Sequence, residues 1–113
     1  MIRRATHDDL DEIVEIAGKL ISDMDLPAAT DDELRDIASR ILDDGVIFLA
    51  PGGMIWGLVV PLYYKPDHLE ANEIFWWSDG GHGLSLVRAF EAWGAEQGAK
   101  SIVMSSKANI DPA

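Results

Sequence analysis

The sequence has no cysteine, so a disulfide framework, a thiolate nucleophile and a cysteine-based zinc site are excluded. It also has no apolar run near the roughly 18 residues that a membrane-spanning helix needs. The longest apolar stretch, Met54 to Tyr64, is interrupted by Gly57 and Pro61. The first residues lead straight into an acidic segment, without the apolar stretch of a signal peptide. We therefore expect a cytoplasmic protein with no membrane partner.

Basic residues are scarce, with 9 Lys and Arg against 20 Asp and Glu, and the formal net charge is −11. The excess is concentrated between Asp8 and Asp44. A nucleic-acid binder needs a basic stripe, so this charge argues against a nucleic-acid partner. Three interpretations of the acidic segment remain: a solvated helical surface, a surface that attracts a basic or amine-bearing partner, or an imitation of nucleic acid toward a nucleic-acid-binding protein.

The 113 residues, with 48% apolar content, predict one globular domain over residues 1–113. Ile2 to Ala5 is expected to form a short strand. Apolar residues spaced by three and four predict a helix that follows Thr6 and fades near Met24. Thr30-Asp31-Asp32-Glu33 has the pattern of a capping box and predicts the start of a second helix, which ends at Asp44-Gly45.

The second half of the chain changes to strand-like patterns. The predicted strands are Val46–Ala50, Met54–Tyr64, Glu70–Trp77 and Ser101–Ser105, with a loop at Lys65–His68. A helix with Leu86, Phe90 and Trp93 on its apolar face precedes the last strand. The predicted order is β-α-α-β-β-β-α-β, an α/β (α+β) fold with a mixed sheet that closes in a parallel βαβ unit. Residues 106–113 are expected to form an irregular tail.

A glycine-rich segment, Asp79-Gly80-Gly81-His82-Gly83, joins a predicted strand directly to a predicted helix. Such a turn places backbone N–H groups at a positive helix end, which suits a phosphate. The alternative is a merely tight turn. The segment lacks the Gly-Lys-Ser/Thr of a Walker A loop and the spacing of a dinucleotide fingerprint.

At this point the chain resembles the GNAT acetyltransferases, over nearly all of its length. The most specific segments are Ile2-Arg3-Arg4-Ala5-Thr6 with Asp8-Asp9-Leu10, and Glu73-Ile74-Phe75-Trp76-Trp77 followed by the glycine turn and Leu86 to Trp93. These look like the short GNATs of bacteriophage and bacterial genomes. The resemblance implies a three-stranded antiparallel meander before the βαβ unit, and acetyl-CoA as the co-substrate.

The family's loop has the form Arg/Gln-x-x-Gly-x-Gly/Ala, which places its glycines on Gly81 and Gly83 and its first residue on Ser78, a departure. The resemblance implies that the backbone amides of Gly80 to Leu84 hold the pyrophosphate. His82 is either an additional donor or an exposed turn residue. The remaining cofactor contacts that the resemblance implies are the backbone of Phe75, Trp76 and Trp77, along the pantetheine arm, and Asn109.

Acetyl transfer to an amine needs a base and an acid. The resemblance places the base on Glu73, which burial in a central strand would suit to that task, whereas a strand-end glutamate would lie in solvent. The family's acid, a tyrosine on a later helix, has no counterpart in the sequence. Tyr63, Tyr64 and Ser106 are possible replacements. The histidines lie in separate segments, so we predict no metal site.

Two functions follow. The first is an N-acetyltransferase that moves an acetyl group from acetyl-CoA to a primary amine of a protein or a small molecule. The second is a catalytically degenerate GNAT-fold interaction protein that binds a protein partner through its acidic helices. For the first function, a homodimer or a larger protein partner would complete the acceptor side.

Overall fold

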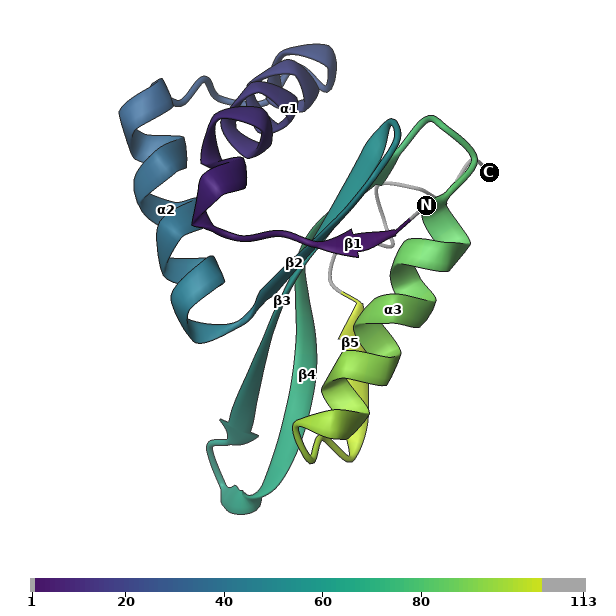
Figure 1. Ribbon diagram of the computed structural model, residues 1–113. Helices are drawn as coiled ribbons and strands as arrows, with labels where there is room; N and C mark the ends of the chain where they lie inside the picture. Colours follow the sequence, from purple (N-terminus) through teal and green to yellow (C-terminus); the bar gives the residue numbers. More distant parts are fainter. Residues whose placement is uncertain (1, 105–113) are drawn as a thin grey trace.

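The structure, a computed structural model, describes residues 2–104 and is shown in Figure 1. Strand β1 (Arg3–Arg4) leads through a 3-10 turn (His7–Asp9) into helices α1 (Leu10–Asp23) and α2 (Asp31–Asp44). The rest of the chain forms β2 (Val46–Ala50), β3 (Gly53–Leu62), β4 (Lys65–Ser78), α3 (Gly83–Glu96) and β5 (Ser101–Met104). None of these helices is long and apolar enough to cross a membrane.

The five strands form one sheet in the order β1-β2-β3-β4-β5. Neighbouring strands are antiparallel except β4 and β5, which are parallel. Helices α1 and α2 lie on one side of the sheet and α3 lies on the other (Figure 1). The predicted α/β fold is therefore confirmed, with its antiparallel meander followed by a parallel βαβ unit.

Reciprocal side-chain caps begin α2 and the 3-10 turn that precedes α1. At Thr30 the hydroxyl accepts from the Glu33 N–H at 3.1 Å, and the Glu33 carboxylate accepts from the Thr30 N–H at 2.8 Å. This is the predicted capping box, and it satisfies two donors that a helix end would leave unpaired. Thr6 forms a similar box with Asp9, but it starts the 3-10 turn, so α1 begins only at Leu10.

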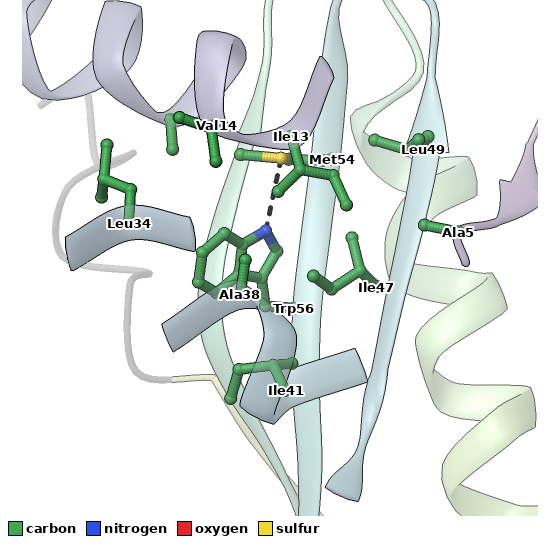
Figure 2. Close-up of a cluster of buried hydrophobic side chains, with 11 residues drawn as sticks. Ala5, Ile13, Val14, Leu34, Ala38, Ile41, Ile47, Leu49, Met54 and Trp56 are labelled. Carbon is green, nitrogen blue, oxygen red and sulfur yellow. Dashed lines mark hydrogen bonds between the residues drawn. The ribbon is translucent and has the colours of Figure 1, made fainter. Parts of the chain in front are cut away.

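The side of the sheet under α1 and α2 is packed around Trp56 (Figure 2). The indole Nε1 of Trp56 donates to the Met54 sulfur at 3.3 Å, and its ring meets Phe75 edge-on with centroids 5.2 Å apart. Trp56 and Trp93 are almost fully buried, in agreement with the core role that large aromatics usually take. Trp93 belongs to the cluster under α3, with Phe90, Leu86 and Ala71.

Several predicted boundaries are wrong. The first strand is only Arg3–Arg4, and β3 ends at Leu62 because Tyr63 and Tyr64 form the turn into β4. β4 begins at Lys65, where a loop was expected from Pro66 and Asp67. Leu62 pairs with Lys65 but Pro61 pairs with Leu69, so the register skips the residues between them. Proline has no backbone N–H to donate to a neighbouring strand, so Pro61 is tolerated at this irregularity.

A second irregularity lies in the middle of β4. Trp56 is opposite Phe75 and Gly57 is opposite Glu73, which leaves Ile74 as an extra residue on β4. This is a β-bulge. Ala71 packs with the α3 cluster while Phe75, four residues later, packs with the α1 and α2 cluster. In a regular strand these two side chains would share a face. Because of the extra residue, the side chains after it lie on the face opposite to the one that regular alternation would give.

The packing at the bulge predicts a large effect of Gly57→Ala. A Cβ at Gly57 would collide with the Phe90 ring, whereas one at Gly18 in α1 would only touch the Leu34 Cδ1 at 3.9 Å. Overpacking should lower the free energy of unfolding by about 1–3 kcal/mol in Gly57→Ala. Gly18→Ala should raise it by up to about 1 kcal/mol, because alanine favours helix. Urea unfolding of both variants measures this, and equal stability of the two would contradict the packing.

Candidate functional site

The glycine-rich segment joins the end of β4 to the start of α3. The Asp79 N–H donates to the Gly52 carbonyl at 2.9 Å, so the segment is held against the β2–β3 turn. A Cβ at Gly80 would collide with the Pro51 carbonyl oxygen, so the close packing at this position favours glycine. Gly81 has φ +81° and no atom within 4 Å of a Cβ built on it. The backbone at Gly81 is therefore open to close approach by a ligand.

The amino end of α3 next to this segment has free donors. His82 is the N-cap and makes no side-chain cap bond, and the first backbone bond runs from the Leu86 N–H to the His82 carbonyl at 2.9 Å. The N–H groups of Gly83, Leu84 and Ser85 therefore have no acceptor within the helix. No acidic residue lies in the first turn of α3, so its positive end is not neutralised there.

Two buried polar atoms lie beside the same helix end. Among the described residues the Trp76 Nε1 and the Ser78 Oγ have no hydrogen-bond partner. A Cβ built on Gly83 would be 3.5 Å from the Trp76 ring and 3.6 Å from the Ser78 Cβ, so both side chains adjoin Gly83. A buried donor without a partner is costly, and a bound oxygen-rich group would relieve that cost. These atoms and the open Gly81 backbone fit a phosphate-bearing ligand.

Glu73 is the buried charged side chain of the described core, with 1% of its surface exposed. It lies on β4 immediately before the bulge, opposite Gly57 of β3 and Met104 of β5. Of the two possibilities for this residue, the buried glutamate is correct and the solvated strand-end glutamate is wrong. Bulges often occur beside active sites because they redirect a side chain or end a run of pairing.

Comparison with solved structures identifies the architecture. A protein of Arthrobacter sp. FB24 assigned as an acetyltransferase matches 97% of this chain and 78% of its own, with 20% identity and a TM-score of 0.81. A predicted acetyltransferase from Clostridium acetobutylicum, crystallised with acetyl-CoA, matches 92% of this chain and 79% of its own, with 14% identity and a TM-score of 0.76. The chain has the fold of the GNAT acetyltransferases.

An aminoglycoside acetyltransferase from an uncultured soil sample, in complex with sisomicin, has the same fold. It matches 98% of this chain and 82% of its own, with 15% identity and a TM-score of 0.68. No family model and no curated protein sequence matches the chain. The likeness to the acetyltransferases therefore lies in the fold.

Most of the residues that the GNAT resemblance named lie together at one end of the sheet. Phe75, Trp76 and Trp77 follow the bulge on β4 and lead into the glycine segment. His82 is half-buried and Leu84 is exposed at the first turn of α3. Asn109 and Ser106 lie outside the described residues. Tyr63 and Tyr64 pack edge-on against each other at the opposite end of β4, so the fold does not bring them to the glycine segment.

An open groove of about 490 Å³ borders this end of the acetyltransferase fold. Its walls come from β1, α1, the β2–β3 turn and the end of β4. The charged residues along it are Arg3, Glu12, Lys19 and Asp79, and Trp77 supplies an aromatic surface. The sequence analysis did not find this groove, because its residues are spread over nearly eighty positions.

The Arg3 side chain is fixed in the groove by hydrogen bonds to two carboxylates. Its guanidinium donates to both oxygens of Asp9 at 2.9 and 3.0 Å and to Glu12 at 3.3 Å. The bonds from Arg3, together with the Thr6 N–H, hold the pKa of the Asp9 carboxyl below its usual range. The same bonds to Asp9 raise the pKa of Arg3.

The lowered pKa of Asp9 predicts a pH-dependent effect of Asp9→Asn. A carboxyl whose pKa is lower in the folded state stabilises the fold above its unfolded pKa of about 3.9, and that contribution disappears as the pH falls through the folded value. The wild type should therefore have a higher Tm than Asp9→Asn at pH 7, and the difference should shrink below about pH 4. A difference that stays constant from neutral to acid pH would contradict this account.

Proposed function

We propose that the chain is an acetyl-CoA-dependent N-acetyltransferase that acts on a primary amine. The observation that carries the proposal is the position of buried Glu73, just before a bulge in the strand that leads to the open Gly81 and the amino end of α3, which has no side-chain cap. One strand thus links a candidate base to a candidate phosphate site. The fold shared with acetyltransferases supports the same reaction class.

Different segments of β4 and α3 would bind different parts of acetyl-CoA. Backbone N–H groups from Gly80 to Leu84 would bind the pyrophosphate, and His82 would be a further donor. Ser78, in place of the family's Arg or Gln, brings a neutral hydroxyl, so the site holds its anion mainly with backbone dipoles. The backbone of Phe75 to Trp77 would orient the pantetheine arm, and Asn109 remains a proposed contact outside the described residues.

Acetyl-CoA, when bound, supplies the acetyl group as a thioester that an amine nitrogen can attack. Glu73 would take the proton that the nitrogen loses as its new bond to carbon forms, directly or through one water. Its burial keeps the carboxylate away from bulk solvent, where electrostatic interactions are weaker. The departing sulfur needs a proton in return, and no described residue near Glu73 is assigned to that task.

The acidic helices support the second function, an interaction protein. Three acids of α1 and α2 are in ion pairs with arginines, Asp11 with Arg35, Glu12 with Arg3, and Asp36 with Arg40, and the Asp43 Oδ1 lies 2.8 Å from the His7 Nε2. The other exposed acids of α1 and α2 would attract a basic protein partner or concentrate amines near the site. The enzyme requires the binding of acetyl-CoA, and the interaction protein does not.

Cofactor binding predicts a contrast between two glycines at opposite ends of α3. Gly81 and Gly98 both have positive φ, at +81° and +87°, so a tryptophan strains the backbone similarly at either place. Acetyl-CoA should bind the wild type with a micromolar Kd, about −8 kcal/mol, in calorimetric titration. Gly81→Trp should abolish this binding and Gly98→Trp should retain it. No binding to the wild type would contradict the enzyme and favour the interaction protein.

The role of Glu73 predicts a loss of turnover without a loss of cofactor affinity. Glu73→Gln keeps the size of the side chain but removes the base, so release of CoA with spermidine as acceptor should slow on the order of 10²–10⁴-fold. Glu91→Gln, at an exposed position on α3, is the matched control and should leave the rate unchanged. Equal rates for the wild type and Glu73→Gln would remove Glu73 from the reaction.

A further inference from the structure

Charge is distributed unequally over the two sides of the sheet. Helices α1 and α2 carry most of the acidic residues and cover one side, and α3 covers the other (Figure 1). The segment from Gly83 to Met104, which spans α3 and β5, has two acids and two bases, so its net charge is zero. Two copies of a chain with a net charge of −11 repel each other. The outer face of α3 is therefore where a second copy meets the least repulsion.

The outer face of α3 carries its charges in an order that suits a second copy. Arg88, Ala92 and Glu96 are spaced by four residues, so they lie in one row along the helix, with a base at one end and an acid at the other. All three residues are exposed. Neither Arg88 nor Glu96 is in an ion pair within residues 2–104. Both charges are thus available to a partner.

An open groove of about 310 Å³ lies beside this row, between α3 and the first two strands. Its lining residues are Arg4, Phe48, Ala89, Ala92, Trp93 and Glu96. Ala89 and Ala92 have small side chains, so the backbone of another helix can come close to α3 there. Phe48 is half-buried and Trp93 is buried, so both give the groove an apolar surface. The face thus joins an apolar hollow to a row of opposite charges.

From this arrangement we propose that the chain forms a homodimer in which α3 packs antiparallel against α3 of a second copy, with Ala92 at the two-fold axis. Such an axis makes an interface self-complementary, because residue i of one copy meets residue j of the other and the reverse. With Ala92 at the axis, Arg88 lies about 6 Å to one side along the helix and Glu96 about 6 Å to the other. Each Arg88 then faces the Glu96 of the second copy, and the dimer has two such ion pairs.

The antiparallel direction follows from the same charges. Parallel helices related by a two-fold axis would place Arg88 opposite Arg88 and Glu96 opposite Glu96, and like charges at such distances are destabilising. The antiparallel contact also leaves the amino end of α3 outside its centre, because Leu84 is about 12 Å along the helix from Ala92. The dimer and the proposed acetyl transfer are therefore independent of each other.

Analytical ultracentrifugation over a range of protein concentrations tests the dimer. Exposed ion pairs and small apolar side chains each contribute little, so we expect a dissociation constant on the order of 10 µM. The dissociation constant should rise with salt, because salt screens the exposed ion pairs. A wild type that remains a monomer at concentrations far above this value overturns the inference and leaves the face to a different partner.

Exchange of the two charges tests which residues form the contact. Glu96→Arg would place two arginines together and should weaken dimerisation at least about tenfold, and Arg88→Glu should do the same with two glutamates. The double variant, Arg88→Glu with Glu96→Arg, brings opposite charges together again and should restore the dimer. Glu91→Arg makes the same change of charge about 100° around the helix from Ala92 and is the control, which should dimerise at least as strongly as the wild type.

The Glu96→Arg variant also separates this contact from a general effect of charge. It makes the net charge of each copy less negative, so a general effect would strengthen the dimer, whereas the proposed contact predicts that it weakens. An unchanged Tm of each variant is the check on folding. Single variants that dimerise as the wild type does, or a double variant as weak as the single ones, overturn the inference.

Discussion

The facing of the β4 side chains that lead from Glu73 to the glycine segment depends on one extra residue, a β-bulge in that strand. Ile74 has no opposite residue on β3, so the strand faces change between Ala71 and Phe75. Before the bulge, β4 pairs with β3 and β5 and holds buried Glu73. After the bulge, the aromatic residues of the strand lead directly into the glycine segment. If β4 ran regularly without the bulge, Ile74 would be opposite Trp56, and Phe75 would point at α3 and lose its contact with Trp56.

Much of the fold could be predicted from local signals. The capping box at Thr30, the β-branched run Val46–Ala50 and the order of strands and helices are all present in short stretches of sequence, and the structure contains them. The start of β4 was not predictable in this way. Pro66 and Asp67 are turn formers by local preference, and only pairing with the long β3 draws this segment into the sheet.

The site was partly predictable for a similar reason. The glycine segment is continuous in sequence, so its place at the start of α3 could be inferred, and the resemblance to a family singled out Glu73. The bulge beside Glu73 has no local signature, because it arises from the register of two strands. Hydrogen bonds on β4 and β5 join His68, Ser101 and Glu70 across more than thirty residues, and only the parallel pairing of β4 with β5 brings them together.

In the proposed enzyme, acetyl-CoA would lie along the end of β4 and over the amino end of α3. Amide hydrogen exchange, compared with and without acetyl-CoA, tests this placement residue by residue. The account predicts slower exchange of backbone amides between Phe75 and Leu84, with little change in α1 and α2. Protection confined to the helices, or no protection anywhere, would contradict it.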